Sequence, residues 1–596
     1  MPHPPTAADA SPPTDAAIQL APAPPDEAPL AFHRGHAYPR AIAWFGFKSF
    51  WGHLWKLAAS VIATEDIDSR DWMQPDDPDA LTQRIAIELG ADPSARTLTE
   101  ALDRDLVIDF VADTGDDVSV SRAVAEMLFE SYRAPDGTLL PRGDLLVFGG
   151  DTAYPVANEL EIHNRVIVPW NRVLRDKPLD KARVLLGIPG NHDWYAGLDG
   201  FGRMFRAPLG DIGRTSVMLG KATLDPGAEK PEEIVSAAPI RHFFEWAEAF
   251  RVGRRVIKRA ALPLIGYRPV QSASYWALRL APHLDLWGPD RQLVDVDDRQ
   301  RAFFGRLRED DPERGLALVM ADPPWAFLEP HKAGQRILHA LDLSLEGDAL
   351  LALTGDIHHY CRLRFGGGMQ VTAGGGGAFL HPARMSRKGL HRPEAEFPGP
   401  KATLRIALLA PWQIVRGRAG WMIHTVLLLA FLPEHLLSRW GHPTANAAFA
   451  TGAVLTILLA AIGGAWKKRR GSVWAMAAIG GALLGALPWA FGQAAALAWD
   501  LGVHGLAAFV GALVLSVFSG ALVVGVYFMA LTILGFASDE GFGPLAHPGY
   551  KHFVRLFVKR DGSGIEGWVI GKVDPLDPDG QAVLVDRWEW KSPSKR

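Results

Sequence analysis

Residues 184 to 193 read Val-Leu-Leu-Gly-Ile-Pro-Gly-Asn-His-Asp, an apolar run followed by an amide, an imidazole and a carboxylate. The apolar run is typical of a buried strand, which Pro189-Gly190 would end. A turn alone does not require Asn191-His192-Asp193 after Pro-Gly, although the same three residues could cap a helix. The stretch therefore predicts either a functional site at a strand end or a structural cap.

Three other apolar runs end in polar residues. The runs and the residues that follow them are 106–111 with Asp113, 144–148 with Asp151, and 349–353 with Asp356 and His358. Strands that alternate with helices form layered α/β domains, in which such ends share one edge of the sheet. Carboxylate, amide and imidazole donors suit divalent metals, and a mixed set suits two ions that share a carboxylate. A two-metal centre is therefore expected at this edge, although Gly-Asp after a strand can also be a simple turn.

In their order, the four blocks resemble those of the calcineurin-like metallophosphoesterase superfamily, which are D-x-H, G-D, G-N-H-D/E and G-H-x-H. The resemblance covers residues 105 to 385, and its most specific part is Gly190 to Asp193. It implies a four-layer α/β/β/α sandwich that hydrolyses a phosphate ester with two divalent cations, from among Mn, Fe, Mg and Zn.

The resemblance also implies roles for individual residues. Asp113 would bind the first metal ion, Asp151 would bridge both ions, and Asn191 would bind the second. His358 would complete the first ion. His192 would stand beside the scissile phosphate as an acid or electrostatic stabiliser, and Asp193 would orient it; these two are the expected catalytic residues.

The chain departs from the family pattern where the family has histidines. Gly115 and Asp356 replace two of them, and residues 320–325 lack a third. Asp322 or Asp356 could supply oxygen ligands instead, which would favour Mn or Mg over Zn. Asp116 could partly replace the first missing histidine or could cap the following helix.

Four glycines at 374–377 follow another apolar stretch. Their N–H groups could face a phosphate, or the run could be only a tight turn. His381, shortly after them, is a further candidate for a ligand or substrate contact.

Length and charge limit the class of protein. The 596 residues are too many for one core, and a net charge of −4 gives no reason to expect nucleic acid as a partner. The single cysteine, Cys361, excludes an intramolecular disulfide.

Composition predicts five regions. They are a disordered Pro/Ala-rich tail (1–30), an N-terminal helical segment (31–104), the phosphoesterase domain (105–400), a transmembrane region (401–537) and a C-terminal β-hairpin module (538–596). Within the second, residues 41–63 place aromatic and aliphatic residues at helical spacing, with Lys48 and Lys56 between them. This segment is expected to lie either in a membrane interface or against the soluble core.

Four long apolar segments follow residue 400, and each is long enough to span a bilayer. They are 420–437, 445–466, 471–499 and 505–537. The basic loop 467–470 predicts a multi-pass protein of the cell membrane with its catalytic domain in the cytoplasm.

The sequence therefore predicts a membrane-anchored, metal-dependent phosphoesterase. Tethering favours a phosphorylated lipid or lipid-linked head group as substrate, with membrane lipid as a partner. The alternative is a catalytically weakened sensor or scaffold, because family histidines are missing at Gly115 and Ala321. A transporter is less favoured, because the apolar segments contain few ionisable residues. Nothing in the sequence sets the oligomeric state.

Overall fold

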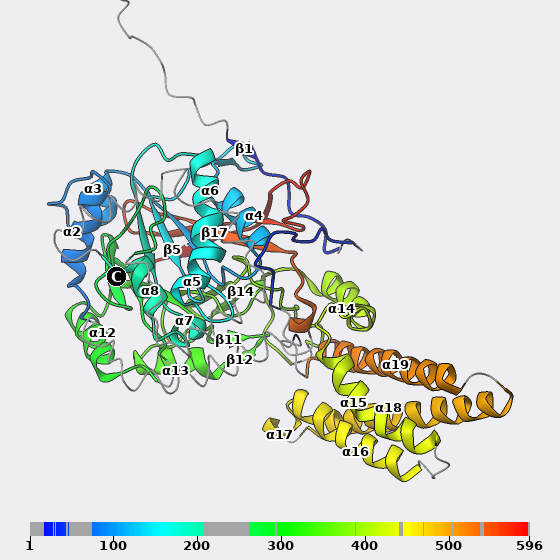
Figure 1. Ribbon diagram of the computed structural model, residues 1–596. Helices are drawn as coiled ribbons and strands as arrows, with labels where there is room; N and C mark the ends of the chain where they lie inside the picture. The colour runs from blue at the N-terminus through cyan, green and yellow to red at the C-terminus, as the bar shows by residue number, and fades with distance from the viewer. Residues whose placement is uncertain are drawn as a thin grey trace, which may run out of the picture.

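The computed structural model describes residues 17–42, 46, 74–207, 261–439, 445–468, 470–502, 505–536 and 542–593, except 28, 30, 293, 294 and 388. Most of the predicted helix at 41–63 and the first part of the predicted tail lie outside these residues. The described part comprises a globular α/β body and a helical bundle that projects from it (Figure 1).

Two seven-stranded sheets form the globular body. The first has the order β19-β18-β17-β2-β5-β6-β7 and the second the order β16-β14-β15-β13-β10-β9-β8. The first contains β2 (Leu106–Val111), β5 (Leu145–Phe148), β6 (Arg183–Gly187), β7 (Tyr267–Pro269), β17 (Lys551–Val558), β18 (Gly564–Lys572) and β19 (Val583–Lys591). The second contains β8 (Trp276–Ala281), β9 (Leu284–Gly288), β10 (Gly315–Met320), β13 (Leu350–Thr354), β14 (Tyr360–Phe365), β15 (Gly368–Ala373) and β16 (Ala395–Phe397).

The central strands are parallel in both sheets, as the alternation of strands and helices predicts. In the first sheet β2, β5, β6 and β7 run parallel. In the second sheet β9, β10, β13 and β15 do so. The carboxyl ends of the strands within each parallel set therefore lie at one edge of that sheet. The expectation of a mixed α/β domain is confirmed.

Alternate side chains of each strand enter different cores, because successive residues of a strand point to opposite faces. Ile108 and Phe110 of the first sheet share one core with Leu351 and Leu353 of the second. Their neighbours, such as Val111, join a core with the helices that cover the sheets. Those helices are α4 (Val118–Leu128), α6 (Val168–Asp176), α12 (Asp298–Asp310) and α13 (Lys332–Ala340).

Shorter elements complete the body. They are β1 (Ile18–Gln19), α2 (Pro78–Glu88), α3 (Leu98–Leu102), β3 (Tyr132–Arg133), β4 (Leu139–Leu140), α5 (Glu159–Ile162), α7 (Asn191–Trp194), α8 (Asp199–Phe205), β11 (Trp325–Ala326) and β12 (Glu329–Pro330).

The C-terminal strands are built into the first sheet. β17 pairs antiparallel with β2, the strand that leads to Asp113. Arg555 of β17 is fully buried and forms an ion pair with Asp109 of β2, at 2.7 Å between Nε and Oδ1. Arg555 also donates to the carbonyl oxygens of Leu128, Glu130 and Leu140. The sheet that carries the predicted site therefore requires residues from both ends of the chain.

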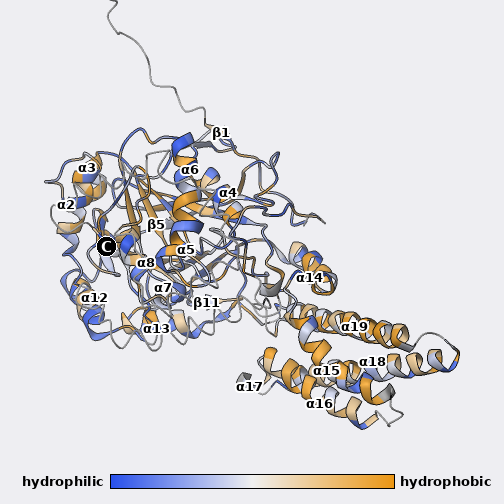
Figure 2. Ribbon diagram, in the orientation of Figure 1, coloured by the Kyte–Doolittle hydropathy of each residue, from blue (hydrophilic) through white to orange (hydrophobic). Residues whose placement is uncertain are grey.

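Among the described residues, three helices are long and apolar enough to cross a membrane. They are α16 (Ala445–Ile462), α18 (Gly471–Asp500) and α19 (Gly505–Leu534). Figure 2 shows their apolar residues along the projecting bundle. The predicted segment 420–437 corresponds to α15 (Met422–Arg439), whose apolar part, Met422–Leu437, is shorter. Its end contains Pro433, Glu434 and His435, which interrupt the apolar run.

The bundle also buries ionisable groups that the apolar composition of the sequence obscures. Glu434 and His435 are 1 % and 2 % exposed. Nε2 of His435 lies 2.9 Å from Oγ of Ser516 in α19. This contact joins α15 to α19.

A further helix, α14 (Pro400–Val415), joins the globular body to the bundle (Figure 1). It packs on α19, where a Cβ added to Gly525 would lie 2.5 Å from Cα of Pro411. Leu404, Leu408 and Trp412, four residues apart, are 39 %, 55 % and 51 % exposed. This spacing places the three side chains on one face of the helix, so α14 presents an apolar stripe beside the membrane-like helices.

Candidate metal centre

Three aspartates turn sharply at the ends of parallel strands. Asp113 follows β2, Asp151 follows β5 and Asp356 follows β13, with φ values of 58°, 49° and 63°. A left-handed backbone is unfavourable for most residues other than glycine, and Asp is among those that adopt it most readily. These turns place two carboxylates after strands of the first sheet and one after a strand of the second sheet.

The hydroxyl of Tyr154 lies among these groups. Its Oη is 2.9 Å from Oδ1 of Asp113, 3.3 Å from Oδ2 of Asp151 and 2.9 Å from Nε2 of His358. The side chain is buried, because Tyr154 is 1 % exposed. The two carboxylates come from the first sheet and the imidazole from the second.

The hydrogen-bond donors and acceptors of this cluster are the kind of set that binds a cation. Nδ1 of His358 lies 2.8 Å from the carbonyl oxygen of Phe379, so Nδ1 carries the proton and Nε2 presents a lone pair. The single hydroxyl proton of Tyr154 thus faces three acceptors. A phenol can satisfy only one of them. A metal ion bound by the same atoms would satisfy all of them, so the donor set fits a cation.

Burial and mutual repulsion add to this argument. Burial, together with Asp151 and Asp356, raises the pKa of Asp113 well above its usual range. Burial and the neighbouring His381 lower the pKa of His358 far below its usual range. The site thus collects buried acidic groups around a neutral imidazole, and a bound cation would offset their repulsion.

A second cluster adjoins the first. Asp322, His331 and Asp356 each offer a ligand atom, and these atoms lie within 4.8 Å of one another. The backbone N–H of Asp356 donates to Oδ2 of Asp113 at 2.9 Å, which links the clusters. Nδ1 of His331 lies 3.2 Å from the carbonyl oxygen of Pro323, so its Nε2 is the nitrogen available for binding.

Arg291 provides positive charge beside the second cluster. Its Nε donates to Oδ2 of Asp322. Although burial lowers the pKa of Arg291, the carboxylates of Asp322, Asp356 and Asp151 raise it overall. A guanidinium in this position can pair with phosphoryl oxygens.

His192 is held by the backbone. The ring nitrogen Nδ1 of His192 lies 2.6 Å from the carbonyl oxygen of Pro155. The backbone N–H of His192 donates to Oδ1 of Asp151 at 2.9 Å. The proton on Nδ1 leaves Nε2 as the nitrogen that can face a substrate. Asp193 instead accepts from the N–H groups of Gly190 at 2.9 Å and Thr152 at 3.3 Å. Burial and Asp151 raise the pKa of Asp193 to about 7.

The other predicted site residues occupy different positions. Nδ2 of Asn191 donates to Oη of Tyr195 at 3.1 Å, which leaves its carbonyl oxygen as a possible metal ligand. Asp116 accepts from the N–H of Ile42 at 2.8 Å, so this carboxylate is directed to the N-terminal segment. Nδ1 of His381 accepts from the N–H of His358 at 3.0 Å, and the two rings stack.

Glycines allow the backbone to close around the carboxylates. An added Cβ at Gly355 or Gly374 would lie 2.8 Å or 2.6 Å from Oδ2 of Asp113. The N–H of Gly376 donates to the carbonyl oxygen of Ala112 at 2.9 Å. The glycine run thus packs against the end of β2, which agrees with the tight-turn interpretation.

Sequence reasoning missed Tyr154, Arg291, His331 and Lys551. Tyr154 could have been noticed as a polar aromatic in the loop of Asp151. Lys551 is fully buried and donates to the carbonyl oxygen of Ala378, and burial lowers its pKa to about 7. Arg291, His331 and Lys551 carry no local signal, because only the fold brings them to the site.

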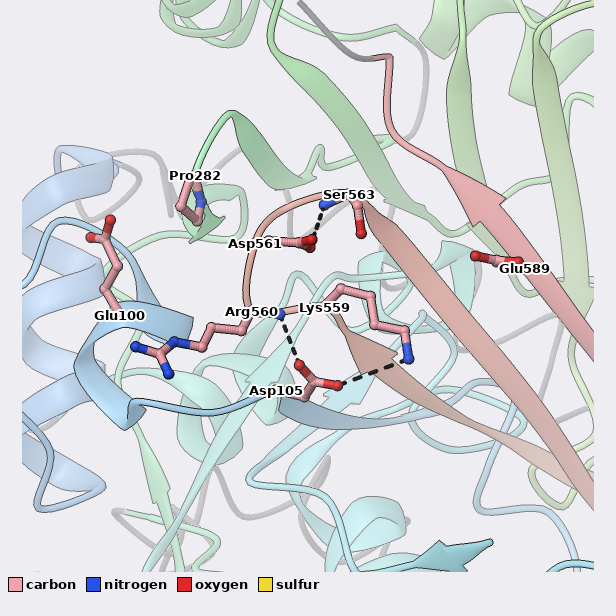
Figure 3. Close-up of a pocket in the computed structure, with 8 residues that line it drawn as sticks. All are labelled: Glu100, Asp105, Pro282, Lys559, Arg560, Asp561, Ser563 and Glu589. Atoms are coloured by element: carbon pink, nitrogen blue, oxygen red, sulfur yellow. Dashed lines mark hydrogen bonds and ion pairs between the residues drawn. The ribbon is translucent and has the colours of Figure 1, made fainter.

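A separate pocket of about 480 Å³ lies at the other end of β2, beside Asp105 (Figure 3). Nζ of Lys559 lies 3.3 Å from Glu566 and 3.9 Å from Asp105, and the N–H of Arg560 donates to Asp105 at 2.8 Å. These charged groups already pair with one another. The metal centre is therefore the stronger candidate for chemistry.

No family model and no curated protein matches this chain. Among the solved structures that are similar to it, two cover about half of this chain. One is "GAP50 the anchor in the inner membrane complex of Plasmodium", at 10 % identity and a TM-score of 0.26, covering 48 % of this chain and 76 % of that one. The other is "Structure of PhoD", at 12 % identity and a TM-score of 0.22, covering 46 % of this chain and 58 % of that one. Both TM-scores are below 0.5, so neither likeness carries weight for function.

Proposed function

We propose that this protein is a membrane-attached phosphoester hydrolase that depends on two metal ions. The observation that supports this most strongly is the Tyr154 cluster, where one hydroxyl proton faces three buried acceptors. The body would be a four-layer α/β/β/α sandwich, with the metal centre at the edge where both sheets end.

The first ion would be bound by Asp113, Asp151, Tyr154 and His358. The second would be bound by Asp151 and Asn191 together with Asp322 and Asp356, with His331 in reach of the same cluster. Most of these donors are oxygens, which favours Mn, Fe or Mg over Zn. When bound, such ions lower the pKa of a coordinated water and neutralise phosphoryl oxygens.

The residues around the ions have separate tasks. Nε2 of His192 would donate a proton to the leaving oxygen or a hydrogen bond to the phosphoryl group. Arg291 would exchange its ion pair with Asp322 for the incoming phosphate. Asp193 would act through the backbone, because it holds the N–H groups of Gly190 and Thr152 and so fixes the turn before His192.

The bundle supports membrane attachment. We propose four spans, with α15 as the shortest, in the cell membrane and with the catalytic domain and both termini in the cytoplasm. The stripe of Leu404, Leu408 and Trp412 on α14 would lie at the headgroup level. A phosphorylated lipid or lipid-linked head group is the substrate class that this attachment favours.

A sensor or scaffold is the second candidate. The ion pair between Arg291 and Asp322 favours it, because this pair already neutralises one predicted ligand without a metal ion. In that case the protein would bind metal or phosphate without hydrolysing a phosphoester.

The test uses the full chain in detergent, because β17, β18 and β19 belong to the sheet that carries the site. Phosphate mono- and diesters, soluble and in lipid vesicles, are tested with Mn, Mg, Fe or Zn. We expect hydrolysis that Asp151→Asn abolishes and that Asp311→Asn, remote from the centre, leaves unchanged. Binding of metal without hydrolysis of any ester would favour the scaffold.

A further inference from the structure

A second group of metal-binding side chains lies on the edge of the second sheet. Cys361 is the second residue of β14, and His359 lies in the bend directly before that strand. Cys361 pairs directly with Glu396 of β16 in the antiparallel ladder. The strand register therefore brings the thiol and the carboxylate together, and the bend before β14 adds the imidazole.

The three groups converge in the interior. One ligand atom from each of His359, Cys361 and Glu396 lies within 4.8 Å of the others. His359 and Cys361 are 2 % and 6 % exposed, and the side chain of Glu396 is 6 % exposed. Tetrahedral ligand atoms at zinc distances stand roughly 3.5 Å apart, so small side-chain rotations would close the site.

Two buried polar atoms of this group have no hydrogen-bond partner among the residues that the structure describes. They are Nδ1 of His359 and Oε1 of Glu396. The other carboxylate oxygen of Glu396 accepts from Arg387. A buried polar atom without a hydrogen bond is unfavourable, so native proteins rarely contain one. A bound ion would account for both atoms at once.

We propose that His359, Cys361 and Glu396 bind one Zn²⁺ ion, separate from the ions of the phosphoester centre. Thiolate, imidazole and carboxylate together are a zinc donor set, whereas Mn²⁺ and Mg²⁺ prefer oxygen ligands. Binding converts the thiol of Cys361 to a thiolate and releases its proton to solvent. The thiolate and the carboxylate then neutralise the ion, and water supplies a fourth ligand.

The position of this site gives it a positioning role. His359 directly follows His358, whose Nε2 faces Tyr154 and Asp113. The ring of Phe327 stacks on the ring of His359, with 6.1 Å between the ring centroids. It also makes a T-shaped contact with the ring of His381, with 5.9 Å between the centroids. Zinc bound to His359 would therefore fix the loop that presents Asp356 and His358.

The single cysteine makes a sharp test possible. Because Cys361 is the only cysteine of the chain, any thiolate–metal absorption must come from this site. The full-length protein is stripped of metal, loaded with Co²⁺ and examined in the near ultraviolet for the thiolate–cobalt band. We expect the band in the unmodified protein and in Asp151→Asn, and its complete loss in Cys361→Ala.

Zinc content gives an independent measurement. We expect Cys361→Ala and Glu396→Gln each to lose one equivalent of tightly bound Zn²⁺, and Asp348→Asn to lose none. Absence of the cobalt band in the unmodified protein would overturn the proposal even if a variant failed to fold. Unchanged zinc content in folded Cys361→Ala would overturn it as well. Neither readout requires hydrolysis, so this site and the phosphoester centre can fail separately.

Discussion

Oη of Tyr154 lies 2.9 Å from Nε2 of His358, although 204 residues separate them. Tyr154 follows β5 of the first sheet and His358 follows β13 of the second. The centre is thus shared between the sheets, and its geometry depends on how they meet. A close contact supports this: a Cβ added to Gly150 after β5 would lie 3.0 Å from Cβ of Ala321 after β10.

Removing the hydroxyl of Tyr154 should weaken the metal centre without unfolding the chain. In Tyr154→Phe the ring still fills its buried site. We expect metal affinity or activity to fall by about 10- to 100-fold, as for other changes around metal ligands. Metal content and hydrolysis are measured together. If both stay at the unmodified level, Tyr154 is only a packing residue.

His192 should act in the chemistry and not in metal binding. His192→Ala should lower kcat by about 10² or more, because it removes the acid or hydrogen-bond donor near the leaving oxygen. Metal content should not change. Loss of the metal ions in this variant would instead make His192 a ligand.

The pair of Arg555 and Asp109 should be essential for stability. Arg555→Met would leave Asp109 buried without its cation, which costs about 3–5 kcal/mol. The control is Arg587→Met, because the Arg587 side chain is 47 % exposed and its pair with Glu566 contributes little. Thermal unfolding of both variants measures the difference. Equal losses of thermal stability in the two variants would mean that the ion pair between β17 and β2 does not stabilise the sheet.

Acid should destabilise the globular body through the buried His552 and the half-buried His547. Burial lowers the pKa values of His547 and His552 to about 3, below the ordinary value of 6.5. Both stay neutral in the folded chain and bind a proton on unfolding. Their stabilising contribution is therefore complete above about pH 6.5 and is lost as the pH falls toward 3, by about 1.4 kcal/mol per pH unit for each.

The measurement is the melting temperature between pH 7.5 and 4.5. His547→Phe should reduce the slope, whereas His339→Gln, which replaces an exposed histidine of α13, should not. A slope that is the same in both variants would show that His547 does not contribute.

Orientation in the membrane can be tested with reporter fusions. Four spans and a cytoplasmic C-terminus predict that reporters at Asp500 and at the C-terminus report opposite sides. Reporters on the same side would mean that α19 crosses the membrane twice or not at all.

Local sequence patterns predicted the parts of the fold that depend on local order. Apolar runs ending in Asp113, Asp151 and Asn191 marked three parallel strands or the turns after them, because burial and a sharp stop are both visible in sequence. The pairing of β17 with β2 was not predictable, since about 440 residues separate them and the hairpin pattern does not name its partner.

The same limit applies to the site. Arg291, His331 and Lys551 reach it only through the packing of distant segments, and no spacing rule joins them to Asp322 or Asp113. The hydrogen bond that fixes the ring of His192 comes from the carbonyl oxygen of Pro155, and a backbone carbonyl has no sequence signature. Composition identified three membrane-like helices, but Pro433 and Glu434 shortened the apolar part of the fourth.

The most direct test is to locate metal ions in crystals of the full chain loaded with Mn²⁺, by anomalous X-ray scattering. We expect one peak among Asp113, Asp151, Tyr154 and His358, and a second between Asp151 and the Asp322–Asp356 cluster. In Asp151→Asn both peaks should weaken, because this carboxylate serves both ions. An unbroken Tyr154–His358 hydrogen bond, with no peak at either position, would show that these residues do not form a metal centre.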